Sequence, residues 1–148
     1  MLSGVVSEAT GSSALEYATE VLFDPLGIEE VVWPADPQGY TRGWADLMLL
    51  PADAARFGEL WLDGGQWDGR QVLSSSLVDA LAVPVAASPD GAGYALGWWV
   101  DQSAEVGPIV SARGGGGQYV VVIPALEVVV VTAGSGTYGP GDLIGMLV

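Results

Sequence analysis

Four consecutive glycines, Gly114 to Gly117, separate two β-prone segments of this sequence. Residues 107–112 lead into the run, and Tyr119–Ile123 and residues 127–133 follow it. Glycine adopts backbone conformations that other residues avoid, so the run lets the chain reverse direction and brings its N–H groups within reach of other groups. Such a strand end can form an oxyanion hole. A tight hairpin turn without any chemistry is the alternative interpretation.

Length and charge limit the class of protein. A chain of 148 residues, half of them hydrophobic, is long enough for one domain with a buried core. A net charge of −14 disfavours binding to nucleic acid or anionic membranes. No apolar stretch is long enough for a membrane span, and Met1–Gly4 shows no signal-peptide pattern. We therefore expect a soluble chain, cytoplasmic by default, whose compartment the sequence leaves open.

Three residue types that carry much of enzyme chemistry are absent. The sequence has no histidine, no cysteine and no lysine. It cannot form a Ser-His-Asp triad, a zinc site with cysteine or histidine ligands, a Schiff base or a Ser-x-x-Lys nucleophile pair. Carboxylates, hydroxyls, tyrosines, arginines and backbone amides remain. The chain on its own therefore lacks an activated nucleophile of the usual kinds.

Helical and strand patterns alternate along the chain, which predicts an α/β (α+β) fold with an antiparallel sheet flanked by helices. Ser13 and Glu16 form a capping-box pattern that starts a helix to about Leu22. The other predicted elements are a helix-like segment at Leu2–Thr10, loop over Glu30–Gly43, a helix from Pro51 to Leu62, a hairpin-like link at Gln66–Val72, a helix from about Ser75 to Val83, loop over Pro84–Gly93, strands at Tyr94–Val100, Pro108–Ala112, Tyr119–Ile123 and Val128–Ala133, loop over Gly134–Gly141, and a helix beginning at Asp142–Val148.

Several of these segments resemble motifs of the beta-lactamase-related serine hydrolases. That family includes class C beta-lactamases, penicillin-binding-protein-like esterases and D-amino-acid peptidases. The segments that carry the resemblance, in the family's order, are Ala14–Tyr17 with Leu22–Ile28, Leu50–Leu60 with Gly64–Gly69, Tyr94–Trp99, and Ala112–Gln118. The resemblance extends from about Leu2 to Gly136 and implies a beta-lactamase/transpeptidase-like fold that is incomplete at its N-terminus.

The family's mechanism uses a Ser-x-x-Lys nucleophile, a tyrosine motif and a third motif on a strand. Only the third has a counterpart here, with Ala112 at the basic position, Arg113 next and Gly114 at the glycine. The resemblance implies that the Gly115 N–H is the oxyanion donor and that Ala112, Arg113 and Gly114 line the substrate pocket. Arg113 either supplies the charge that Ala112 lacks or points away across the strand. Tyr94, at the start of its strand, is a further candidate for substrate contact, with packing as the alternative. Because Ala112 carries no charge, an ester, amide or peptide substrate fits better than a beta-lactam carboxylate.

We therefore expect residues 1–148 to form a single partial domain, the C-terminal part of a serine hydrolase that needs no metal or cofactor. Its substrate would be a small-molecule ester or amide, or a peptide. The nucleophile would lie upstream of residue 1 or on an upstream polypeptide, and the chain alone would have little or no activity. Two alternatives remain open: a non-catalytic binding or regulatory module on the same framework, and a fragment of a truncated or split gene.

Overall fold

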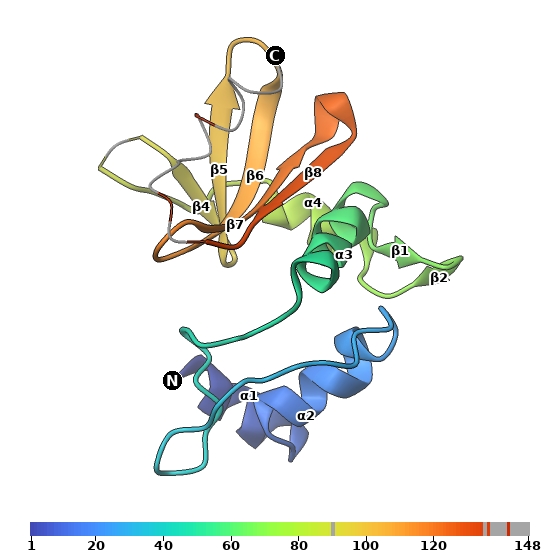
Figure 1. Cartoon of the computed structure of the whole chain (residues 1–148), viewed down its shortest axis with the longest axis vertical. Coiled ribbons are helices and arrows are strands. Elements are labelled where there is room, and N and C mark those ends of the chain that lie inside the picture. Colours follow the sequence, from blue (N-terminus) through green and yellow to red (C-terminus); the bar gives the residue numbers. More distant parts are fainter. Residues whose placement is uncertain (90, 135, 137–141, 143–148) are drawn as a thin grey trace. The chain divides into compact units, whose positions relative to one another are not determined.

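The computed structural model describes residues 1–134 except residue 90, together with residues 136 and 142 (Figure 1). The chain divides into two compact units, Met1–Asp53 and Ala54–Val148. Except for Asp142, the predicted C-terminal helix lies outside the described residues, as does most of the predicted loop after Gly134.

The first unit begins with three short helical segments: α1 (Leu2–Thr10), α2 (Ala14–Ala18) and the π-helical turn η1 (Thr19–Phe23). Gly11 ends α1 in a left-handed conformation, with φ of 76°. The predicted capping box starts α2, since the Ser13 hydroxyl accepts from the Glu16 N–H and the Glu16 carboxylate accepts from the Ser13 N–H at 2.8 Å. That backbone hydrogen bond, assisted by the Ser13 hydroxyl, lowers the pKa of Glu16.

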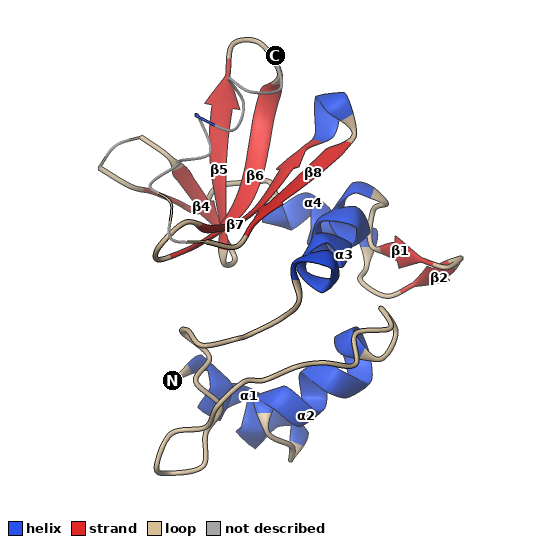
Figure 2. Cartoon of the chain, viewed as in Figure 1, coloured by secondary structure: helices blue, strands red, loops and turns tan. Residues whose placement is uncertain are grey.

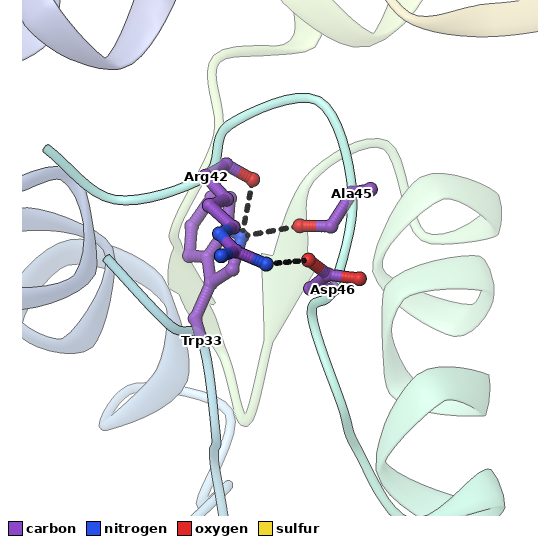
Figure 3. A network of polar contacts seen from close by, with 4 residues as sticks. All are labelled: Trp33, Arg42, Ala45 and Asp46. Atoms are coloured by element: carbon purple, nitrogen blue, oxygen red, sulfur yellow. Dashed lines mark hydrogen bonds and ion pairs between the residues drawn. The ribbon is translucent and has the colours of Figure 1, made fainter. Parts of the chain in front are cut away.

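The rest of the first unit is loop stabilised by isolated polar contacts (Figure 3). The Trp33 indole N–H donates to the carbonyl oxygens of Arg42, at 2.9 Å, and Ala45, at 3.1 Å. The Arg42 guanidinium forms an ion pair with Asp46 at 2.9 Å. Two isolated β-bridges, Val32 with Met48 and Ala35 with Thr41, complete this arrangement. The segment is a loop with short extended pieces, as the sequence predicts.

The second unit contains two helices and a small hairpin between them: α3 (Pro51–Leu62), which begins in the last residues of the first unit, β1 (Gln66–Trp67), β2 (Arg70–Gln71) and α4 (Ser75–Leu81). Asp68 and Gly69 connect β1 to β2. Their φ angles are 47° and 74°, and a two-residue hairpin turn with positive φ at both positions favours the pair Asp-Gly. The Ser74 hydroxyl caps α4 by accepting from the Leu77 N–H at 3.2 Å. The predicted helices from Pro51 and from about Ser75, and the predicted hairpin between them, are present.

A six-stranded antiparallel sheet forms most of the second unit (Figure 2). Its strands are β3 (Ala86–Ala87), β4 (Gly93–Ala95), β5 (Trp98–Ser103), β6 (Gly107–Gly114), β7 (Gln118–Ile123) and β8 (Val128–Thr132), and the short 3-10 helix η2 (Pro124–Leu126) connects the last two. Each strand pairs with the next one along the chain, from β3 to β8. The predicted antiparallel meander is confirmed.

Two predictions about this sheet are wrong. The predicted single strand Tyr94–Val100 is a hairpin, in which Leu96 and Gly97 turn the chain with φ of 47° and 102°. An apolar leucine in a left-handed conformation gives no turn signal in a sequence, which is why the break was not predicted. The predicted loop Pro84–Gly93 contains β3, which pairs with β4.

The register assigns each sheet residue to one of two faces. Val122 and Val129 lie opposite each other, and a Cβ added at Gly58 of α3 would lie 2.5 Å from the Val129 Cγ1 atom and 3.3 Å from the Val122 Cγ2 atom. We call this side of the sheet the α3 face. The other side, which we call the distal face, carries a buried cluster of Val106, Ile109, Val121 and Ile123.

Replacing Gly58 with alanine tests this packing. The added methyl group would collide with Val129, so we expect Gly58→Ala to destabilise the chain by about 1–3 kcal/mol. Gly4 of α1 is the matched control, since a Cβ there would lie 3.7 Å from the Tyr40 ring, an ordinary contact. Gly4→Ala should stabilise its helix by about 0.5–1 kcal/mol. Thermal unfolding of both variants measures the difference, and equal midpoints would contradict the close approach of α3 to the sheet.

Candidate functional site

The glycine run forms the turn between β6 and β7. Gly114 is the last residue of β6 and pairs with Gln118, the first residue of β7. Between them, Gly116 and Gly117 have φ of 81° and 86°, in the left-handed region that favours glycine. Gly115 is not among the positive-φ residues, and its backbone is exposed to solvent. The residue expected to donate the oxyanion hydrogen bond therefore lies in the turn, directly after the strand.

Contacts from the end of β8 fix this turn. The Thr132 hydroxyl donates to the Gly117 carbonyl oxygen at 2.7 Å, and the Gln118 side-chain amide donates to the Gly134 carbonyl oxygen at 2.7 Å. A Cβ added at Gly117 would lie 2.5 Å from the carbonyl oxygen of Gly136. Nothing lies within 4 Å of the corresponding position at Gly115. The turn is thus tightly packed at Gly117, whereas the space beside Gly115 is open.

The end of β6 has a strand partner on one side only. Pairing with β5 stops at Trp99 opposite Ser111, whereas pairing with β7 continues to Gly114 opposite Gln118. Within the residues that the structure describes, no strand pairs with Ala112–Gly114 on the β5 side. An unpaired strand edge can form main-chain hydrogen bonds with an extended ligand. This edge leads directly to the exposed Gly115.

Neighbouring residues on β6 point to opposite faces, so the expected site residues separate. Ala112 lies on the α3 face, opposite Val120, and is half-buried. Arg113 lies on the distal face, as does Tyr94, which pairs with Trp99. The structure therefore brings Ala112, Gly114 and Gly115 together at one strand end. It places Arg113 and Tyr94 together on the other side of the sheet.

Arg113 is surrounded by contacts on the distal face. Its Nε–H donates to the Ser111 hydroxyl at 2.9 Å, and its terminal nitrogen forms an ion pair with the Asp101 carboxylate. The guanidinium carbon lies 5.1 Å from the centre of the Trp99 ring, a cation–π distance. Tyr94 packs edge-on against the same ring, with centroids 5.1 Å apart.

Sequence reasoning did not identify Asp101 or Ser111 as part of this arrangement. The available signal is alternation: Trp99 and Asp101 share one face of β5, and Ser111 and Arg113 share one face of β6. The register that brings the two pairs together cannot be read from one strand alone. Among the described residues, no group of three or more histidine, cysteine, aspartate or glutamate side chains could hold a metal ion. No described helix is long and apolar enough to cross a membrane.

Comparisons with known proteins give one family and several related folds. A model of the beta-lactamase family matches residues 1–146. A Bacillus anthracis protein described as a 6-aminohexanoate-dimer hydrolase has 27% sequence identity and a TM-score of 0.83, with 99% of this chain and 39% of that chain covered. No curated protein matches the chain.

Two further solved structures share the fold. An octameric penicillin-binding protein homologue from Pyrococcus abyssi has a TM-score of 0.77 and 16% identity, over 99% of this chain and 40% of that one. A penicillin-binding protein homologue from Caulobacter crescentus has a TM-score of 0.68 and 15% identity, over 95% of this chain and 52% of that one. The chain therefore spans between 39% and 52% of the length of these three structures.

Two glycine substitutions test the geometry of the turn. Gly117→Ala would force alanine into a left-handed conformation against the Gly136 carbonyl, so we expect a loss of about 1–2 kcal/mol and a melting temperature lower by about 2–8 °C. Gly115→Ala meets open space and an ordinary φ, so it should leave the melting temperature nearly unchanged. If both variants melted alike, the asymmetry of the turn would be wrong.

Proposed function

Because the chain belongs to the beta-lactamase family, we propose that it is part of a serine hydrolase that acts through an acyl-serine intermediate. The match over residues 1–146 is the observation that carries this proposal. The 27% identity to a protein described as a 6-aminohexanoate-dimer hydrolase supports hydrolysis of an amide or a related acyl bond.

In the proposed reaction, a serine oxygen attacks the carbonyl carbon of the substrate, and the carbonyl oxygen takes up the negative charge. The Gly115 N–H donates a hydrogen bond to that oxygen. The alcohol or amine then leaves with a proton, and water hydrolyses the acyl-serine to regenerate the hydroxyl. The exposure of Gly115 and the open space beside it support its role as donor.

The proposed substrate is a neutral ester, amide or peptide. Ala112 contributes only a methyl group on the α3 face, and the guanidinium of Arg113 is paired with Asp101 on the distal face. Neither residue offers a free cation for a substrate carboxylate beside the Gly115 N–H. The unpaired edge at Ala112–Gly114 could align an extended acyl group along the strand.

The nucleophile is proposed to come from outside this chain. With no lysine and no histidine, the chain has neither a Ser-x-x-Lys pair nor a Ser-His pair. The related structures are roughly twice as long or longer, since the chain covers 39–52% of them. We propose that an upstream segment or a separate polypeptide supplies the serine, its activating lysine and the tyrosine motif.

Removing the Gly115 N–H tests the proposed donor. The protein for this test joins the chain to the proposed segment that carries Ser-x-x-Lys, and its hydrolysis of a neutral nitrophenyl ester is measured. Gly115→Pro removes the N–H, and the extended Gly114 before it suits a following proline. We expect kcat to fall by about 10²–10³, as when one oxyanion donor is removed.

Gly115→Ala is the matched control, because alanine keeps the N–H and meets open space. It should retain most of the activity. Equal rates for the proline and alanine variants, both shown to be folded by circular dichroism, would contradict the assignment of Gly115. Absence of esterase and amidase activity in the joined protein would contradict the hydrolase proposal and favour a binding module.

A further inference from the structure

The last residues of β6 need support on the β5 side. Because Ala112–Gly114 pair with β7 alone among the described residues, fewer hydrogen bonds hold this end of the strand than its centre. Segments with fewer such bonds open more easily. Gly115 follows directly, so any motion of this end changes the direction of its N–H.

The side chain of Arg113 connects the unpaired end of β6 to the paired part of β5. It runs back along β6, away from the turn, since Ser111 precedes it by two residues and Asp101 pairs with Ile109, which precedes it by four. Its partner Asp101 belongs to the paired part of β5, so the ion pair ties a β6 residue that lies beyond the last β5–β6 pair to the neighbouring strand. The side chains of Arg113 and Asp101 are 22% and 31% exposed, which reduces solvent screening of the pair.

An aromatic stack extends this connection to a third strand. The Trp99 ring lies under the guanidinium, and Tyr94 of β4 packs edge-on against Trp99. A planar guanidinium can stack on an aromatic ring and form a charged hydrogen bond at the same time, whereas a lysine ammonium forms only a point contact. The contacts therefore restrain Arg113 in both position and orientation.

From this geometry we propose that Arg113 is a positioning residue, which ties the end of β6 to β5 and so fixes the direction of the Gly115 N–H. The inference deepens the proposed function and rests on it, because the direction of this N–H matters for catalysis only if Gly115 is the oxyanion donor. It also replaces the expectation that Arg113 and Tyr94 contact substrate: Arg113 acts through the backbone, and Tyr94 supports Trp99.

15N NMR relaxation of the full 148-residue chain gives an order parameter for each backbone N–H, which measures how much the direction of that bond varies. In the wild type, we expect the Gly115 N–H order parameter to be about 0.85, the value of rigid backbone. In Arg113→Ala it should fall to about 0.6 or below, the flexible range. Asp101→Asn should also lower the order parameter of Gly115. Arg113→Lys should give an intermediate value, because lysine keeps the charge but lacks the planar guanidinium.

Arg70→Ala is the matched control, since Arg70 is an exposed arginine of the β1–β2 hairpin. It should leave the order parameter of Gly115 unchanged. The amides of Val110 and Val121, in the centre of the sheet, should stay rigid in every variant. An unchanged Gly115 value in Arg113→Ala would overturn the inference. An equal fall in the order parameters of Val110 and Val121 would also overturn it, because that result would indicate general destabilisation of the sheet.

Kinetics of the joined protein distinguish this inference from the function on which it rests. Arg113→Ala should lower kcat with little change in KM, because it alters a contact made with the transition state. If the joined protein hydrolyses nothing while the order parameter still falls, the proposed function fails and the structural role of Arg113 stands. If hydrolysis occurs and Arg113→Ala leaves both the order parameter and kcat unchanged, the function stands and the positioning role fails.

Discussion

The packing of Gly117 against the Gly136 carbonyl, together with its left-handed backbone, is the constraint on which the site depends. A Cβ at this position would lie 2.5 Å from that oxygen, so the turn requires glycine there. The Thr132 and Gln118 hydrogen bonds hold the turn to the last residue of β8 and to Gly134 beyond it, and Gly114 pairs with Gln118 across the turn. Once that register is set, strand alternation determines which side chains lie on each face of the sheet.

Strand β6 consequently has two faces with different roles. On the α3 face, the strand ends in Ala112 and Gly114, with an unpaired edge on the β5 side, and the exposed Gly115 follows in the turn. On the distal face, the Arg113 guanidinium lies over the Trp99 ring and forms an ion pair with Asp101. A single positive charge two residues before the proposed donor is thus directed away from it. Arg113 can therefore be close to Gly115 in sequence without providing a positive charge that would bind an anionic substrate group there.

Much of the fold could be predicted because its signals are local. The Ser13 capping box, the Asp68–Gly69 turn and the valine-rich strands depend on residues close together in sequence. The Leu96–Gly97 hairpin could not be predicted, because a leucine in a left-handed conformation gives no turn signal in the sequence. The motif indicates the glycine-rich end of β6, and the structure places Gly115 in the turn directly after that strand. The separation of Ala112 from Arg113 follows from alternation, but the partners of Arg113 depend on the register between β5 and β6, which neither strand encodes alone.

The central claim is that this chain supplies the oxyanion strand of a serine hydrolase and that the nucleophile comes from elsewhere. Intact-mass analysis after treatment with a fluorophosphonate probe, which modifies activated serines, tests it most directly. The account predicts no mass shift for the 148-residue chain and one added probe per molecule when the Ser-x-x-Lys segment is joined to it. Stoichiometric labelling of the 148-residue chain alone would contradict the account, because it would require a serine activated without histidine or lysine.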